Sequence, residues 1–193
     1  MFRHLSRLIA VTFVLTVVTL IHAHKSQAVT LPPKIQAGQD ELILNGWGTR
    51  ARSFVQLYIA GLYLTQPNNR PAEIVSANAP MAIRINITSR FVTQQRLISS
   101  LSDGFYRSTR GNTTTIRNEI NQFRRFFRDP VRTGDVFDIV YLPEHGVIVN
   151  KNGEFKGMIS GMEFKQALFN IWLSENPVDG NLKRGMLTSR TTR

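Results

Sequence analysis

The sequence predicts an α+β fold in which helices gather on an antiparallel sheet. Residues 81–88 (MAIRINIT) alternate apolar and polar side chains, which is typical of a strand with one buried and one open face. Residues 92–108 and 114–129 instead repeat apolar side chains at helical spacing. Asn152 and Gly153 form the dipeptide that a tight hairpin turn favours. The resulting order of strands, two helices, strands and a helix favours an antiparallel sheet with helices beside it.

The first strands are expected in the N-terminal half of the chain. Residues 37–48 (AGQDELILNGWG) suggest a short strand that places Leu42 and Leu44 on one face. Residues 53–64 (SFVQLYIAGLYL) alternate and are rich in β-forming side chains, so they predict a half-buried strand. The turn-forming residues 66–71 (QPNNRP) end that strand.

The helix predicted over residues 114–129 is unusually basic. Its apolar stripe consists of Ile116, Ile120, Phe123 and Phe127. The remaining positions carry four arginines, namely Arg117, Arg124, Arg125 and Arg128. Such a helix can bury its stripe on a sheet, which is the commoner case, or lie on a membrane surface.

The C-terminal part is expected to form a β-hairpin and one further helix. Residues 135–143 and 145–159 predict the strands, with the Asn-Gly turn inside the second segment. Ser160 and Glu163 have the spacing of a capping box, which predicts the start of the helix. Residues 175–180 (ENPVDG) end it.

The two chain ends are expected to lie outside the folded domain. Residues 1–28 are predicted to be a secretory signal, because two arginines precede an uncharged run at residues 8–21. This run is shorter than the roughly 20 apolar residues of a transmembrane helix. Ser26 and Ala28 have the spacing of a signal peptidase site, so in a bacterium the protein would be periplasmic. An uncleaved anchor is the alternative, and residues 188–193 are expected to be a disordered tail.

The chain is strongly basic, with 24 Lys and Arg against 13 Asp and Glu among 193 residues. Its arginines are densest between residues 84 and 132. A basic face can meet nucleic acid or anionic lipid headgroups. No nucleic-acid recognition motif accompanies the charge. We therefore expect no nucleic-acid partner. A solvated arginine-rich surface is the commoner explanation, and an anionic membrane surface is retained as the alternative.

Several kinds of chemistry are poorly supported by the residue types present. Cysteine is absent, which excludes disulfides, thiolate catalysis and cysteine-ligated metal. After the predicted signal the one histidine is His145, and no metal-ligand or serine-hydrolase motif accompanies it. We therefore expect neither a metal nor another cofactor. Ser99 and Ser100 are expected on a helix surface.

Arg50 and Arg52 stand just before the apolar segment 53–64. An arginine there can pair with a surface acid and lay its stem along apolar neighbours. It can also be a fixed cation at the rim of an apolar cleft, where it would bind a carboxylate or an enolate. The residues alone leave both explanations open.

Residues 44–64 contain Gly48-Thr49-Arg50 and a strand that ends in Gly-Leu-Tyr-Leu. This segment resembles the chalcone isomerase superfamily. Residues 134–187 resemble the C-terminal half of bacterial chalcone isomerase-like proteins through the Asn-Gly hairpin, the helix with IWL, and NPVD…LKRGML. The resemblance covers residues 38–187. It implies an open-faced β-sandwich, with helices layered on one side of a large antiparallel sheet and a ligand cleft between sheet and helices.

The resemblance also implies a role for Arg50. In plant chalcone isomerases the matching arginine stabilises an anionic phenolate and the developing enolate, and in fatty-acid-binding relatives an arginine holds a carboxylate. The other family positions have changed. The threonine is replaced by Tyr58, the catalytic tyrosine by Arg96, and the asparagine seven residues later by Asp103.

Three functions follow from these observations. The first is a non-catalytic periplasmic binder of a fatty acid or similar small amphipathic carboxylate, with Arg50, Tyr58, Arg96 and Asp103 as its ligand-binding residues. The alternative is an isomerase (intramolecular lyase) that acts on a chalcone-like enone with Arg50 as its catalytic residue. The third is an envelope interaction protein whose basic helix meets anionic lipid.

Overall fold

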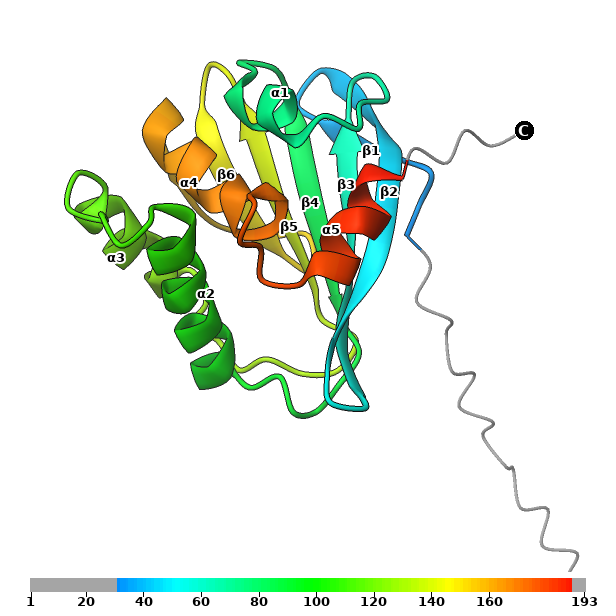
Figure 1. Ribbon diagram of the computed structural model, residues 1–193, viewed down its shortest axis with the longest axis vertical. Helices are drawn as coiled ribbons and strands as arrows, with labels where there is room; N and C mark the ends of the chain where they lie inside the picture. The colour runs from blue at the N-terminus through cyan, green and yellow to red at the C-terminus, as the bar shows by residue number, and fades with distance from the viewer. Residues whose placement is uncertain (1–30, 189–193) are drawn as a thin grey trace, which may run out of the picture.

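The computed structural model describes residues 31–188, which form a seven-stranded antiparallel sheet with helices on one face (Figure 1). The strands lie side by side in chain order, and every neighbouring pair is antiparallel. They are β1 (Lys34–Ala37), β2 (Asp40–Arg52), β3 (Val55–Leu64), β4 (Met81–Ile87), β5 (Val136–Leu142), β6 (Gly146–Lys151) and β7 (Glu154–Ile159). The helices are α1 (Pro71–Ser76), α2 (Gln94–Ser108), α3 (Arg117–Arg125), α4 (Met162–Leu173) and α5 (Gly180–Leu187).

The predicted α+β class and antiparallel sheet are confirmed, with corrections at particular elements. The short strand predicted over residues 37–48 is wrong in its bounds, because Ala37 ends β1 and β2 runs from Asp40 to Arg52, where it pairs with β3. Arg50 therefore lies inside a strand. No sequence pattern predicted β1, α1 or α5 as separate elements. The predicted signal at residues 1–28 and residues 189–193 lie outside the described residues.

The predicted capping box at the start of α4 is wrong. Gly161 occupies the N-cap position with φ of 110°, and no side chain caps the helix. The Ser160 hydroxyl instead donates to the carbonyl oxygen of His145 at 3.3 Å. Glu163 accepts a hydrogen bond from the Thr115 hydroxyl, before α3. Both side chains are thus used in contacts between distant segments, which local spacing cannot reveal.

The main core lies between the sheet and the helices. Ile83, Ile85 and Ile87 of β4 are buried in it, as their alternation predicted. An aromatic cluster joins three helical segments, since Phe105, Phe123 and Phe164 have ring centroids 5.5 to 5.8 Å apart. Helix α3 therefore buries its apolar stripe in the protein and exposes its arginines. Among residues 31–188, no helix is both long and apolar enough to cross a membrane.

Helix α5 packs directly on the backbone of β2. A Cβ atom built on Gly46 would lie only 2.4 Å from the carbonyl oxygen of Gly185. A Cβ on Gly185 would meet the carbonyl oxygen of Trp47 at 2.4 Å, and one on Gly48 would meet the Leu182 Cα at 3.0 Å. Side chains are thus excluded from this contact. The Gly-Trp-Gly sequence is a packing motif that seats α5 beside Arg50.

Buried Lys165 of α4 holds the end of α1. Its ammonium donates to the carbonyl oxygens of Val75 at 2.6 Å, Ala77 at 2.8 Å and Ile74 at 3.3 Å. A helix C-terminus leaves such carbonyls unpaired, and a cation there is also attracted by the negative end of the helix dipole. Burial lowers the pKa of Lys165 to about 8.

Replacement of Gly46 by Ala should destabilise the fold by about 2 kcal/mol or more. The added methyl group meets backbone oxygens, which cannot turn away as a flexible side chain can. Chemical unfolding followed by circular dichroism measures the loss. Gly180→Ala is the control, because its nearest atom would be 3.8 Å away and its effect should stay within about 0.5 kcal/mol. Equal losses in the two variants would contradict the close contact.

Replacement of Lys165 by Met should destabilise the fold by about 2 to 4 kcal/mol, because buried carbonyl groups lose their donor. The pKa of Lys165 is lowered on folding, so above about pH 8 the unfolded state binds more protons than the folded state. The stability advantage of wild type over Lys165→Met should therefore grow from pH 7.5 to pH 9.5, a range that brackets the lowered pKa. Exposed Lys34→Met, the control, should show neither effect; a pH-independent difference would refute the lowered pKa.

Candidate functional site

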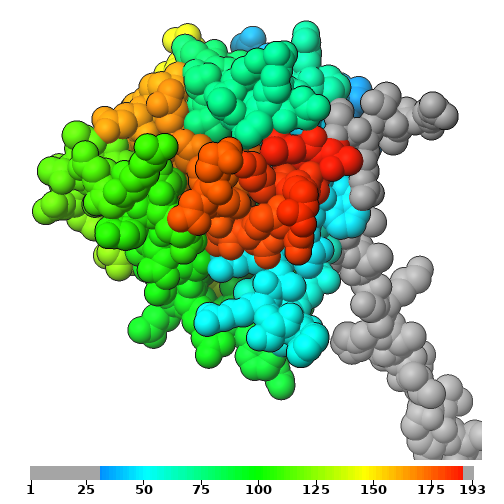
Figure 2. All heavy atoms as spheres, in the orientation of Figure 1, coloured from blue at the N-terminus to red at the C-terminus, as the bar shows by residue number. Residues whose placement is uncertain are grey.

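A cleft of about 490 Å³ opens between the β2–β3 hairpin and α2. All four residues expected from the sequence, Arg50, Tyr58, Arg96 and Asp103, line it. Figure 2 shows α2 in green and the hairpin in cyan on the lower part of the molecule. The volume lies within the range typical of small-molecule sites, roughly 300 to 1,000 Å³. One cleft thus brings together residues from two strands and a helix.

Arg50 lies in the floor of this cleft. It is opposite Tyr58 in the β2–β3 register, so both side chains point toward the helices. One guanidinium nitrogen, Nη1, donates to the Ser100 hydroxyl at 2.9 Å, and the Cζ atom lies 5.8 Å from the centroid of the Tyr58 ring. Among the described residues, no carboxylate forms an ion pair with Arg50. Most of its five N–H donors are therefore free for a ligand.

Tyr58 is only 5% exposed and supplies a neutral hydroxyl. Its oxygen accepts a hydrogen bond from the indole nitrogen of Trp172 at 3.2 Å. Burial raises the pKa of Tyr58, and the nearby charge of Arg50 opposes this rise only partly. The phenol therefore keeps its proton at neutral pH. No acceptor for that proton occurs in the described part of the chain, so it is available to a ligand.

The expectation that Ser100 is a mere helix-surface residue is wrong. Ser100 is half-buried, lines the cleft and accepts the hydrogen bond from Arg50, whereas Ser99 is exposed. Because the Ser100 oxygen is the acceptor, its own proton is free to point at a ligand. The sequence did hold a signal: Ser100 is three residues after Leu97 and four before Gly104, both on the buried face of α2.

Arg96 and Asp103 lie at the rim of the cleft. Both are exposed, and they are seven residues apart on α2. The Nη1 atom of Arg96 donates to the carbonyl oxygen of Phe91 at 3.2 Å, which ties the segment before α2 to the helix. The structure therefore separates the four expected residues into a floor pair, Arg50 and Tyr58, and a rim pair.

The space between sheet and helices behind Arg50 is almost closed. Only about 20 Å³ remains there, because Phe127, Ile171 and Trp172 fill it. This is little more than the volume that one water requires. The resemblance implied a ligand cleft between sheet and helices, and the open volume lies at one end of that space, between strands β2–β3 and α2. An acyl chain reaches the interior only if these side chains move.

The cleft is electropositive. Arg50, Arg52, Arg96 and Arg107 line it, against the single carboxylate of Asp103. Arginines that converge in a recess raise the local concentration of anions. Among residues 31–188, no group of three His, Cys, Asp or Glu side chains is placed to hold a metal ion. The arrangement is suited to the binding of an anion through guanidinium and hydroxyl donors.

Comparison with known proteins places this fold in context. The family described as chalcone isomerase-like matches the chain over residues 23–188. No curated protein sequence matches it. The crystal structure of an Arabidopsis thaliana fatty-acid binding protein is similar, with a TM-score of 0.66 and 15% sequence identity. The similarity covers 82% of this chain and 91% of that one, and it establishes a common fold.

Replacement of Arg50 by Met should change the free energy of unfolding by less than about 1 kcal/mol, because no carboxylate loses its partner. Arg84→Met is the matched control. Arg84 holds the shielded Asp138 through two bonds of 2.6 and 3.0 Å, so its loss should cost about 3 kcal/mol. Urea unfolding measures both values. If Arg50→Met destabilises as strongly as Arg84→Met, Arg50 has a structural role.

Proposed function

The chain belongs to the chalcone isomerase-like family, and we propose that it binds a small amphipathic carboxylate, such as a fatty acid, without transforming it. The observation that carries this proposal is that Arg50, in the cleft floor beside the hydroxyl groups of Ser100 and Tyr58, has no carboxylate partner among residues 31–188. A half-buried guanidinium without a carboxylate partner is unfavourable unless an anion joins it. A ligand carboxylate would supply that anion.

The three donor groups match the needs of a carboxylate. A carboxylate has two oxygens with about four lone-pair sites. Arg50 would donate to one or both oxygens in charge-assisted bonds. Ser100 and Tyr58 would each donate a hydroxyl proton, since their oxygens already accept bonds from Arg50 and Trp172. In this arrangement the protein compensates the whole negative charge without a metal ion.

The apolar part of the ligand would lie along the cleft wall. Leu57, Val92 and Leu97 line the same cleft as Arg50, and Phe91 stands at its rim. Since only about 20 Å³ is open behind the floor, short or compact apolar groups should fit best. Longer chains would have to displace Trp172 and Ile171 or extend out of the cleft.

The fold of the Arabidopsis fatty-acid binding protein supports the binder class over the enzyme class. At 15% identity it supports no residue-level transfer. We further propose that the protein works in the periplasm, on the strength of the signal predicted at residues 1–28. There it would meet carboxylates derived from envelope lipids or taken up from outside.

An isomerase remains the second candidate because of one observation. Arg50 and the neutral hydroxyl of Tyr58 are also the kind of groups that would stabilise a developing enolate. The exposed Arg96, which donates to the Phe91 carbonyl oxygen, weakens this candidate, because it takes the place of the family's catalytic tyrosine. The binder is therefore the better supported function.

Isothermal titration with octanoate, laurate and palmitate tests the binder directly. Octanoate should bind, and Arg50→Met should weaken its affinity about 10- to 100-fold through loss of charge-assisted bonds. Arg117→Met, on the exposed face of α3, is the matched control and should bind like wild type. Equal affinity in wild type and Arg50→Met would refute the anchor. Loss of chalcone absorbance that depends on Arg50 would establish the isomerase instead.

A further inference from the structure

One end of the sheet brings the cleft mouth together with several loops. Because the strands are antiparallel in chain order, the β2–β3 turn, residues 88–93 and residues 126–135 all lie at this end (Figure 1). The Thr88 amide donates to the Leu57 carbonyl at 3.1 Å, and the Gly134 amide donates to the Ile87 carbonyl at 2.8 Å. We refer to this surface, formed by residues 52–57, 88–96 and 129–135, as the cleft end.

Large apolar side chains protrude from the cleft end. Phe54, at the tip of the β2–β3 hairpin, is fully exposed at 104%, and Phe91, beside the cleft mouth, is 47% exposed. Val55, next to Phe54, is 37% exposed. An isolated exposed apolar residue is ordinary, but two phenylalanines beside one ligand cleft are not. Burial of both rings would be clearly favourable.

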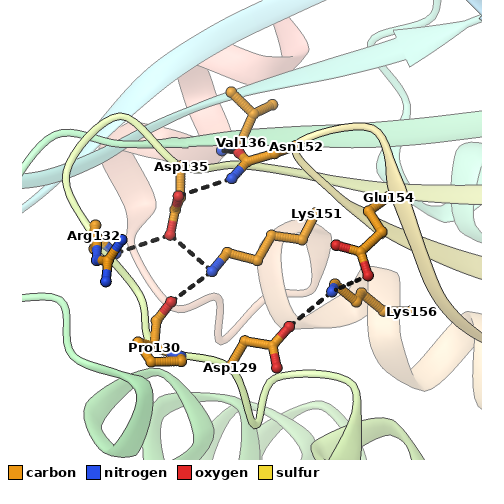
Figure 3. Close-up of polar contacts among 9 residues, drawn as sticks. All are labelled: Asp129, Pro130, Arg132, Asp135, Val136, Lys151, Asn152, Glu154 and Lys156. Atoms are coloured by element: carbon orange, nitrogen blue, oxygen red, sulfur yellow. Dashed lines mark hydrogen bonds and ion pairs between the residues drawn. The ribbon is translucent and has the colours of Figure 1, made fainter.

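The acids of residues 129–135, Asp129 and Asp135, are already paired with lysines. The Lys151 ammonium lies 3.0 Å from a carboxylate oxygen of Asp135, and Lys156 lies 2.7 Å from Asp129 (Figure 3). Asp135 also accepts bonds from the Asn152 amide group and from the backbone N–H of Arg132, each at 2.9 Å. These contacts hold the loop in place, and no carboxylate of the described residues pairs with the guanidinium of Arg132.

The arginines of the cleft end have no such partners. Arg52, Arg90, Arg96 and Arg132 are all exposed. Within residues 31–188, none of them forms an ion pair with an acid. The guanidinium of Arg90 lies 5.5 Å from the Phe91 ring centroid, so cation and aromatic ring form one unit. The cleft end is therefore both cationic and apolar.

We infer that the cleft end docks on an anionic lipid bilayer. Phe54 and Phe91 would enter the interfacial region, while Arg52, Arg90 and Arg132 would contact lipid phosphates. An anionic bilayer presents charged headgroups directly above an apolar region, which matches the arginines and phenylalanines of the cleft end. Helix α3 does not match it, because α3 offers arginines but buries its apolar stripe. Docking would place the cleft mouth against the lipids, so that a ligand need not cross water; this consequence rests on the proposed function.

Vesicle co-sedimentation tests the inference with protein purified from the periplasm. Vesicles of phosphatidylcholine with phosphatidylglycerol should bind the protein, more weakly as salt rises, and phosphatidylcholine alone should bind it poorly. Phe54→Ser with Phe91→Ser should reduce binding at least tenfold. The triple variant Arg52→Ala, Arg90→Ala, Arg132→Ala should reduce it on the order of 100-fold, at about fivefold per arginine.

Matched controls separate docking from net charge and from ligand binding. Tyr106→Ser removes an aromatic ring that is 65% exposed, between the values of Phe91 and Phe54, from the other end of α2. The triple variant Arg110→Ala, Arg117→Ala, Arg124→Ala removes three exposed charges elsewhere. Both controls should bind vesicles like wild type. An equal loss in the control triple, or no preference for phosphatidylglycerol, overturns the inference, as does capture by a soluble polyanion but not by vesicles. Arg50→Met should still dock, so a failure of carboxylate binding is distinguished from a failure of docking.

Discussion

The contact between α5 and β2 is the constraint on which the arrangement of the site depends. Glycines on both sides allow backbone to approach backbone, and no larger side chain fits between them. Helix α5, held in this position, places Leu182 in the core. Just before α5, the Val178 amide donates to the Ile171 carbonyl at 2.8 Å. Together these contacts close the interior behind Arg50. Next to Arg50, the open volume of the described chain therefore lies on the outer side, between the hairpin and α2.

Arg50, in the floor of the cleft, carries a positive charge that no carboxylate of the described residues compensates. Arg84, on the opposite face of the sheet, shows how the chain treats a structural arginine, since Asp138 holds it in two bonds. Arg50 has instead the hydroxyl of Ser100 and the ring of Tyr58. Arg84 therefore stabilises the sheet through its ion pair, whereas the guanidinium of Arg50 keeps donors that a ligand could use. Such unused charge is typical of sites that give up stability for function.

The antiparallel order of the strands gives the molecule two unlike ends. At the cleft end, exposed arginines and phenylalanines surround the mouth of the cleft. At the other end, buried Lys165 fixes the end of α1 by three hydrogen bonds, so its charge serves the fold and does not reach the surface. The proposed ligand site and the proposed docking surface therefore lie at the same end of the sheet. A ligand that enters from a bilayer would meet the half-buried guanidinium of Arg50 in the floor of the cleft.

The sequence by itself determined the α+β class, strands β3 and β4, the Asn152-Gly153 hairpin and the two central helices, because these depend on local periodicity and turn chemistry. It also singled out Arg50, through the resemblance of residues 44–64 to a known family. Tertiary structure alone decided that Ser100 is the partner of Arg50, that Ser160 and Glu163 contact distant segments, and that Phe127, Ile171 and Trp172 fill the interior. The physical reason is one of distance along the chain. Each of these contacts joins residues far apart in sequence, and their packing has no period that local spacing could reveal.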